Sequence, residues 1–367
     1  MIKYTIFVFV ILCLYTILIS IESYKTHDSL KLLHVLFRHG DRTPVKFRYP
    51  TDPYKKEKYD PYGFSQLTNT GKQRAYNLGK WLRRRYDFFL NRTYSTKELS
   101  AYTTNTSRSK ASLSLVLAGL YPPKGTALEW DMQLNWNPIN YEIISETNQL
   151  LMIPTPKCQE LLNLLSSYLN TNEGQGIMKK YDDIKDILSN NTQLSFDNPF
   201  RYLMVYDLVT VQEEQGLGAP KWIEPILPKM SNILNDIFQM FTATKEIRQF
   251  TIGKLLEKIA GDSLLKVNNS PKLRHKKLFM YSAHDFNVGM FLKVINPSVD
   301  HGRPTYSACI MVEIHSINGV HGLKVFYQPD VTQRRRSITI DNCGKFCPLN
   351  KFITLFNENF PGTKNQC

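Results

Sequence analysis

The stretch Leu36–Pro44, LFRHGDRTP, places one histidine, His39, between two arginines, Arg38 and Arg42. An imidazole can attack phosphorus when one ring nitrogen is unprotonated and the other is held by a hydrogen-bond acceptor. A phosphoryl group in transfer carries negative charge on its oxygens, and guanidinium groups bind those oxygens in pairs and stay charged at every relevant pH. This pattern therefore indicates phosphoryl transfer with His39 as the acceptor.

A second polar cluster, His284-Asp285, could supply the proton that this reaction needs. The alkoxide released from a phosphate ester is a poor leaving group unless a general acid protonates it. Asp285 can be that acid, and a protonated His284 would add a cation to the phosphate pocket. Because Asp285 must hold its proton, we expect the highest activity at acid pH.

Other routes to this chemistry lack their signatures in the sequence. No cysteine is followed by an arginine at the spacing of a cysteine-based phosphatase loop, and no two aspartates are spaced D-x-D. There is no Walker phosphate loop and no G-x-S-x-G turn. Closely spaced His and Asp ligands for a metal are also missing. Histidine is the nucleophile that remains.

The elements that must position these residues follow from hydrophobic periodicity. Three short apolar runs are typical of buried parallel strands, namely Lys31–Phe37, Leu99–Thr104 and Lys277–Ser282. Helices are predicted at 67–90, with Thr68 as N-cap, and at Ser107–Leu120. Each strand is followed by a polar cluster: Arg38 to Arg42, Ser107-Arg108, or His284-Asp285. Ligands bind at the carboxyl ends of such strands, so we expect the three clusters to meet there.

The middle of the chain has a different pattern of hydrophobic residues. Residues 142–257 contain amphipathic helical segments and few strand signals; the segments are 160–169, 176–188, 202–215, 226–241 and 247–259. Strands return at Cys309–His315 and Leu323–Gln328, joined by Asn318-Gly319 as in a hairpin. The sequence thus predicts an α/β fold, a doubly wound and mostly parallel sheet built from 24–141 and 258–367, with 142–257 inserted as a helical cap.

Residues 1–23 have the features of a secretory signal peptide, with Lys3 ahead of an apolar stretch and small residues after it. We therefore expect secretion without a membrane anchor, with the lysosomal lumen as the alternative location. The excess of 46 Lys and Arg over 32 Asp and Glu gives a net charge of +14. Runs such as Arg83–Arg85 and Arg334–Arg336 are interpreted as solvated surface, because aromatic residues do not alternate with them, and no nucleic-acid partner is expected.

Five cysteines follow the leader: Cys158, Cys309, Cys343, Cys347 and Cys367. Disulfides are expected in an oxidising compartment, and the odd number leaves one thiol over. Cys343 and Cys347 are close enough to close a small loop. N-glycosylation sequons begin at Asn91, Asn105, Asn190 and Asn268.

Several motifs, taken together and in order, resemble the histidine acid phosphatase family, within it the lysosomal, prostatic and insect venom enzymes. They are Arg38–Pro44, Leu67-Thr68-x-x-Gly71, Leu78-Gly79, Arg85-Tyr86, Leu120–Pro123 and Ser282–Asp285. The resemblance covers nearly the whole mature chain. It implies a phosphoglycerate mutase-like fold, activity on small phosphomonoesters at acid pH without metal or organic cofactor, and frequently a homodimer.

The resemblance also implies residue roles. His39 would be the phosphorylated nucleophile and Asp285 the proton donor. Four further residues would bind phosphate, namely Arg38, Arg42, Arg108 and His284. Disulfides would join Cys158 to Cys367 and Cys343 to Cys347, leaving Cys309 without its usual partner.

The chain departs from the family in two places. The stretch before Arg108 reads Thr103-Thr104-Asn105-Thr106-Ser107 where an R-S-T-D-like sequence is usual. A glycan on Asn105 would crowd the pocket, so we expect glycans at Asn91, Asn190 and Asn268 and none at Asn105. Near Cys158, where relatives place a tyrosine and an arginine toward the leaving group, Met152, Pro154 and Pro156 stand here, so substrate preference is expected to differ.

Three functions remain open at this point. The first is a secreted acid phosphatase. The second is a phytase-like or lysophosphatidic acid phosphatase of the same superfamily, since only the cap selects the leaving group. The third is a secreted venom or salivary binding protein without turnover, which the retention of His39, Asp285 and the arginines disfavours.

Overall fold

The computed structural model describes residues 29–145, 148, 150–151 and 158–362 of the 367-residue chain. The predicted signal peptide at 1–23 lies outside these residues. So do Cys367, Met152, Pro154 and Pro156.

The parallel half of the central sheet has the predicted strands. β1 (Leu30–Arg38) pairs in parallel with β4 (Leu278–Ala283), β4 with β2 (Leu99–Thr104), and β2 with β3 (Glu142–Ile144). The order along the sheet is β3-β2-β4-β1-β5-β6-β7. Strands β2, β4 and β1, which precede the three polar clusters, are therefore neighbours.

The other half of the sheet is antiparallel. β5 (Cys309–Ile317) pairs with β1 and β6 (Val320–Gln328), and β6 also pairs with β7 (Arg336–Ile338) and β8 (Cys347–Pro348). Asn318 and Gly319 both have positive φ, 50° and 78°, as a two-residue hairpin turn between β5 and β6 requires. The predicted hairpin is present.

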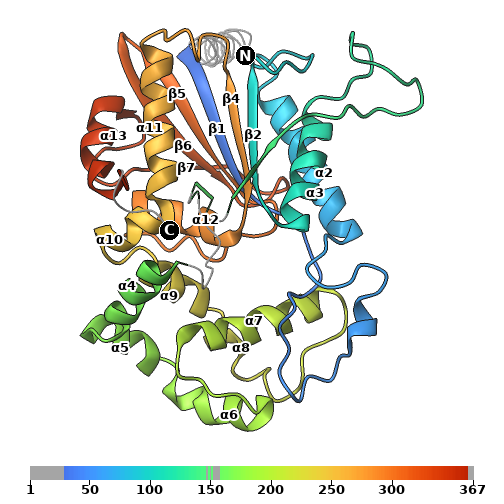
Figure 1. Cartoon of the computed structure of the whole chain (residues 1–367), viewed down its shortest axis with the longest axis vertical. Coiled ribbons are helices and arrows are strands. Elements are labelled where there is room, and N and C mark those ends of the chain that lie inside the picture. The colour runs from blue at the N-terminus through green and yellow to red at the C-terminus, as the bar shows by residue number, and fades with distance from the viewer. Residues whose placement is uncertain (1–28, 146–147, 149, 152–157, 363–367) are drawn as a thin grey trace, which may run out of the picture.

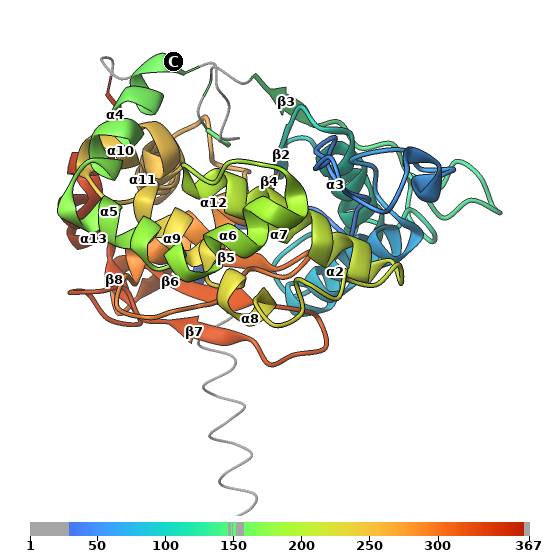
Figure 2. The same ribbon diagram turned by 90° about the horizontal axis from the view of Figure 1, so that it is seen from below.

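Helices cover both faces of the sheet, as Figures 1 and 2 show. One face carries α2 (Asn69–Arg85) and α3 (Ser107–Leu120), and the other carries α11 (Lys254–Val267), α12 (Asp285–Ile295) and α13 (Leu349–Phe356). The prediction of an α/β fold with helices on both faces of one sheet is confirmed; the sheet is mixed, parallel from β3 to β1 and antiparallel from β1 to β7.

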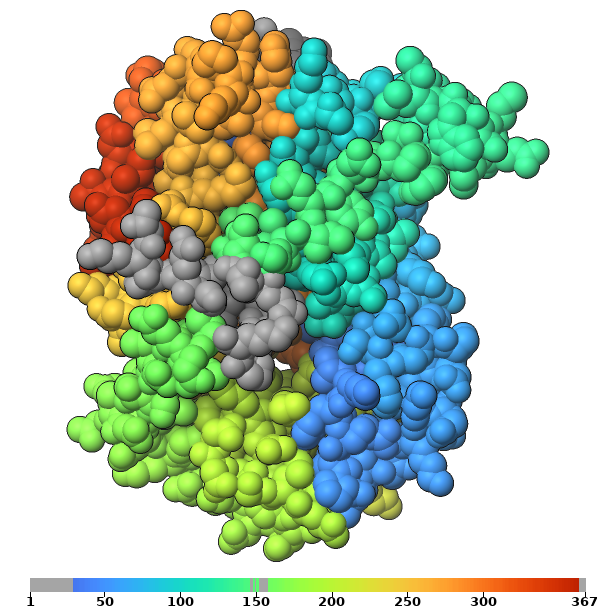
Figure 3. Space-filling model, in the orientation of Figure 1, coloured from blue at the N-terminus to red at the C-terminus, as the bar shows by residue number. Residues whose placement is uncertain are grey.

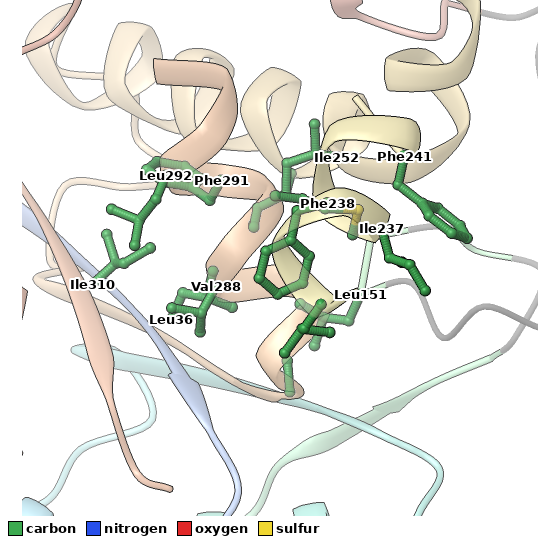
Figure 4. Close-up of a cluster of buried hydrophobic side chains, with 14 of the residues drawn as sticks. Leu36, Leu151, Ile237, Phe238, Phe241, Ile252, Val288, Phe291, Leu292 and Ile310 are labelled. Atoms are coloured by element: carbon green, nitrogen blue, oxygen red, sulfur yellow. The ribbon is translucent and has the colours of Figure 1, made fainter. Parts of the chain in front are cut away.

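The alternation of side chains along β1 explains why the strand is apolar throughout. Leu33, Val35 and Phe37 belong to the core beneath α2 and α3, whereas Leu32 and Leu36 belong to the core on the opposite face. Figure 4 shows Leu36 among side chains that include Val288 of α12 and Phe238 of the cap. The second core therefore continues from the sheet into the cap.

The cap is helical, as expected. Its elements are α4 (Gln159–Leu169), α5 (Asn172–Lys179), α6 (Asp182–Thr192), α7 (Pro199–Glu214), α8 (Leu227–Met230), α9 (Ile233–Met240), α10 (Lys245–Arg248) and the π-helical turn η2 (Gln249–Gly253). The segment that contains η1 (Lys56–Tyr59) also lies against it (Figure 1), where Gln212 Nε2 donates to Tyr59 Oη at 2.9 Å.

Four predicted helices differ clearly from the observed ones. The helix predicted at 247–259 lies within a longer helical run formed by α10, η2 and α11, which ends at Val267. The helix predicted at 67–90 ends at Arg85, and those predicted at 176–188 and 226–241 are each divided in two. In the first divided segment the chain turns at Tyr181, whose buried hydroxyl donates to Asp236 at 2.6 Å. In the second, the Ser231 hydroxyl donates to the Pro228 carbonyl at 2.6 Å and competes with the helical backbone.

The boundaries of the insertion also lie elsewhere than the sequence suggested. Strand β3 starts at residue 142 and belongs to the sheet, so the cap begins after it. The position 257/258 falls inside α11, which contacts β1 and α13. Amphipathic periodicity does not distinguish a cap helix from a helix that covers a sheet.

Candidate active site

The predicted catalytic residues lie at the carboxyl ends of β1, β4 and β2. Arg38 is the last residue of β1 and His39 follows it, His284-Asp285 follows β4, and Arg108 stands in the first turn of α3 after β2. The sheet order makes these three ends adjacent. Segments far apart in the sequence thus meet at one edge of the sheet, as expected.

The turn after His39 depends on two glycines. A Cβ on Gly40 would lie 2.3 Å from the carbonyl oxygen of Gly71, and a Cβ on Gly71 would lie 2.1 Å from that of Asp41. The amino end of α2 can therefore approach the turn only with glycine at both positions. Asp41 accepts hydrogen bonds from Arg74 of α2 at 2.7 and 3.3 Å, which makes Asp41 a structural residue.

His39 is held in one tautomer. Its Nε2 lies 3.0 Å from Nε of Arg108, and its Nδ1 lies 2.8 Å from the Gly40 carbonyl oxygen. A guanidinium can only donate, so Nε2 must be the acceptor and Nδ1 must carry the proton. Burial, with the positive charge of Arg108 next in importance, holds the pKa of His39 well below its usual range. Nε2 therefore keeps its lone pair in acid solution.

Arg38 holds the predicted proton donor. Its Nη2 lies 2.9 Å from Oδ2 of Asp285, and its Nη1 donates to the Pro304 carbonyl at 2.7 Å. The guanidinium also lies over the ring of Tyr306, 4.0 Å from its centroid. These three contacts fix Arg38, which is 2 % exposed, and through it the carboxyl group of Asp285.

Arg42 is paired with a residue of the cap. Its Nη2 donates to both oxygens of Asp207 in α7, at 2.9 and 2.8 Å, and Arg303 Nη2 donates to Oδ1 of the same carboxylate at 2.9 Å. Burial raises the pKa of Asp207, but Arg42 and Arg303 outweigh that effect and lower the pKa to about 2. Nε of Arg38, Arg42 and Arg303 is buried without a hydrogen-bond partner in the described part of the chain.

Two helices begin at the site and direct their amino ends toward it. Thr106 caps α3 by accepting a bond from the Ser109 amide, and His284 is the N-cap of α12. His284 Nε2 lies 3.0 Å from Oγ1 of Thr104. Free amide groups and the helix dipole at such ends favour an anion. Burial, followed by the charges of the arginines, lowers the pKa of His284 well below its usual range, which disfavours the protonated form that we expected.

These side chains border a cavity of about 310 Å³ between the sheet and the cap. The molecule is hollowed where the two parts meet (Figure 3). The polar lining consists of His39, Arg42, Arg108, Asp207, His284, Asp285 and Arg303. The apolar lining comes mainly from the cap and consists of Val45, Phe200, Leu203, Met204, Leu234 and Phe286. One half of the cavity suits an anion and the other a group without charge.

The structure brings together all six residues predicted from the sequence. Sequence reasoning missed Asp207, Arg303, Thr104 and Tyr306. Asp207 is one of many polar residues on an amphipathic helix, and Arg303 lies in a loop without a motif, so neither carried a signal. Only the tertiary structure brings Asp207 of the cap into contact with Arg303.

The cysteines and glycosylation sequons predicted from the sequence can also be located in the structure. Cys343 and Cys347 form a disulfide, and Cys309 is a free, buried thiol. The pairing of Cys158 with Cys367 involves a residue outside the described ones. Asn91, Asn105, Asn190 and Asn268 are all exposed; their glycosylation stays a prediction.

An unprotonated imidazole nitrogen, a carboxyl group in the same cavity and several arginines, all at the carboxyl edge of an α/β sheet, define a phosphoryl-transfer enzyme that uses histidine. Residues 29–316 match the family model "Histidine phosphatase superfamily (branch 2)". The chain belongs to this family, and the prediction that it is a histidine-dependent phosphatase agrees with that membership.

The chain is similar to several named acid phosphatases. It is 31% identical to the venom acid phosphatase of Apis mellifera over 345 residues, which cover 91% of this chain and 86% of that protein. It is 30% identical to the human lysosomal acid phosphatase over 343 residues, which cover 91% of this chain and 78% of that protein. It is 29% identical to the human prostatic acid phosphatase over 341 residues, which cover 90% of this chain and 86% of that protein. The resemblance to acid phosphatases is thereby confirmed.

Solved structures share the fold at lower identity. The Citrobacter braakii phytase aligns with a TM-score of 0.65 and 16% identity, covering 90% of this chain and 98% of the phytase. The Hafnia alvei phytase in complex with myo-inositol hexakis sulphate aligns with a TM-score of 0.66 and 15% identity, and the alignment covers 90% of this chain and 97% of the phytase. At this identity the likeness concerns the fold.

Proposed function

We propose that this protein is a secreted acid phosphatase that hydrolyses phosphate monoesters through a phosphohistidine on His39, with Asp285 as general acid. The observation that carries the proposal is the state of His39: its Nε2 bears a lone pair, and the side chain lines a cavity beside several arginines. A neutral nucleophile and a protonated acid can coexist at acid pH only because burial and nearby cations keep the imidazole from binding a proton.

The reaction proceeds in two displacements. Nε2 of His39 forms a bond to phosphorus while the bond from phosphorus to the ester oxygen breaks, and the proton of Asp285 moves to the departing alcohol. A water molecule then attacks the phosphohistidine, loses a proton to the Asp285 carboxylate and releases inorganic phosphate from Nε2. Arg38, Arg42 and Arg108, with the amino ends of α3 and α12, stabilise the charge on the phosphoryl oxygens.

The apolar half of the cavity favours simple monoesters over inositol polyphosphates. Phe200, Leu203 and Met204 form the cap side of the lining, and beyond Arg42, Arg108 and Arg303 no cation of the described residues lines it. A leaving group with several phosphates would bring charges that this wall cannot neutralise. We therefore expect aryl and alkyl phosphates to be better substrates than a phytate-like polyphosphate.

Secretion is the second part of the proposal. The features of residues 1–23 support it, as do the venom, prostatic and lysosomal origins in the names of the relatives. Among the helices that the structure describes, none has the length and apolar character needed to cross a membrane. The absence of a nucleic-acid partner and of a metal requirement stay predictions.

The purified full-length protein should be assayed with para-nitrophenyl phosphate and with phytate at about pH 5. Wild type should hydrolyse the aryl ester and retain this activity after dialysis against EDTA. His39→Ala should be inactive, whereas His321→Ala, at an exposed residue near the start of β6, should be as active as wild type. Mass spectrometry after a mildly alkaline denaturing quench should find phosphate on His39. If wild type hydrolyses neither ester, a binding protein without turnover is the function that remains. A requirement for a divalent ion would contradict the mechanism.

A further inference from the structure

A series of alternating charges runs from the cap into the pocket. Asp207 accepts two hydrogen bonds from Arg42 Nη2, at 2.9 and 2.8 Å, and one from Arg303 Nη2, at 2.9 Å. Arg303 Nη2 also lies 3.8 Å from Oδ2 of Asp285, and that oxygen lies 2.9 Å from Arg38 Nη2. Asp207 therefore acts on the phosphate donor Arg42 and, through Arg303, on the surroundings of the proton donor.

Asp207 takes no part in the two displacements. It belongs to α7 of the cap and not to the sheet edge, its side chain is 13 % exposed, and the neighbouring lining residues Leu203 and Met204 are apolar. A carboxylate in such surroundings is stabilised only by direct partners, and both of its partners are arginines of the pocket. With a pKa of about 2, Asp207 stays ionised in mildly acid solution.

The balance of charges at the cavity indicates how the carboxylate of Asp207 can affect phosphate binding. Arg42, Arg108 and Arg303 line the cavity and Arg38 is paired with Asp285, whereas the only carboxylates among the described lining residues are Asp207 and Asp285, so positive charge is in excess there. An anionic phosphate group balances this excess. The same donors bind the ester before the reaction and inorganic phosphate after it, so an excess of positive charge would hold the product as well as the substrate.

We propose that Asp207 is a positioning residue that holds Arg42 and Arg303 and competes with bound phosphate for their charge, so that inorganic phosphate can leave after each turnover. This inference rests on the proposed phosphatase function. It assigns to the cap a part in setting the affinity of the pocket for phosphate, in addition to its part in lining the leaving-group side.

Asp207→Asn is the first test, because asparagine keeps the shape of the side chain and removes its charge. The inhibition constant of inorganic phosphate should fall by about tenfold, since the one carboxylate in contact with both Arg42 and Arg303 loses its charge. The turnover number should fall with it as phosphate release slows. Asp207→Glu, which keeps the charge, should leave the inhibition constant within about threefold of wild type.

Charge compensation is the second test. Arg303→Gln should weaken phosphate binding, and the double variant Asp207→Asn with Arg303→Gln, which restores the sum of charges, should return the inhibition constant to within about threefold of wild type. A residue that only supports the fold would not produce this return. If Asp207→Asn does not fold, Arg303→Gln alone still has to raise the inhibition constant.

Asp236→Asn is the matched control. Asp236 is another buried carboxylate of the cap; it accepts from Tyr181 at 2.6 Å and pairs with Lys180, and it is not among the residues that line the pocket. Its replacement should lower the melting temperature without changing the affinity for phosphate. An inhibition constant in Asp207→Asn that is equal to or higher than that of wild type would overturn the inference.

Phosphate binding measured by calorimetry separates the two proposals, because it needs no turnover. A wild type that binds phosphate without hydrolysing esters contradicts the proposed function, and the dissociation constants of the variants then decide the role of Asp207. If wild type is active but Asp207→Asn binds phosphate with the same affinity as wild type, only the inference about Asp207 is contradicted, and the proposed function stands.

Discussion

Arg108 donates its Nε–H to Nε2 of His39 across 3.0 Å, so the nitrogen expected to attack phosphorus is covered by a residue expected to bind phosphate. The bond selects the tautomer with a free lone pair on Nε2. It must break when a phosphoryl group arrives, and the guanidinium can then turn to the phosphoryl oxygens. Arg108 thus prepares the nucleophile before the reaction and stabilises the charge during it.

Arg108→Gln should therefore lower kcat by about 10²- to 10³-fold, the usual effect of removing one donor from a developing oxyanion. Lys110→Gln, two residues further along α3, is the control, because Lys110 binds Asn105 at 3.2 Å and not the pocket. Steady-state kinetics with para-nitrophenyl phosphate at pH 5 measure both. Equal rates for Arg108→Gln and wild type would remove Arg108 from the site.

His39 should take up no proton between pH 7 and pH 5. Its pKa is held well below 6.5 by burial and by Arg108, His284, Arg38 and Arg42, in that order, so protonation of the free enzyme has to occur in stronger acid. Nitrogen NMR of labelled histidine, assigned by comparison with His39→Ala, follows this directly. A ring signal that titrates near pH 6.5 would show that the nucleophile is protonated at the proposed working pH.

Asp207 should stabilise the fold in mild acid. Its pKa is lowered from 3.8 to about 2 in the folded protein, so its contribution is present above the unfolded pKa and is lost as the pH falls through about 2. The difference corresponds to about 2 kcal/mol for this buried group. Asp207→Asn should thus unfold at lower urea concentration than wild type at pH 5, with the gap narrowing toward pH 2. A gap that widens in acid would contradict this sign.

The loop between α3 and β3 should mediate the expected homodimer. It extends away from the body of the molecule (Figure 1) and exposes Trp130, Met132 and Leu134, which are 58%, 89% and 45% accessible. Apolar side chains gathered on one loop are typical of an interface. Replacing Trp130 and Met132 by serine should yield a monomer in sedimentation velocity, whereas Phe88→Ser, at an exposed phenylalanine elsewhere, should not. A wild type that is already monomeric would contradict the dimer.

Local patterns in the sequence predicted most of the sheet edge that carries the candidate active site. Strand β2 and helix α3 have the predicted bounds, and β1 and β4 differ by a residue at each end. Buried strands are apolar on both faces and stop abruptly at polar residues, so their ends can be recognised locally. Since parallel strands end at one edge, His39, Arg108 and Asp285 could be placed together without coordinates.

The tertiary structure alone decided which groups surround that edge. Asp207 lies 165 residues from Arg42 and 96 from Arg303 in the chain, and nothing in the spacing of the three connects them. The same holds for the breaks at Tyr181 and Ser231, where burial and a side-chain hydrogen bond outweigh helical periodicity. Periodicity specifies which face of a helix is buried; the charge that its polar residues meet depends on how the cap packs over the sheet.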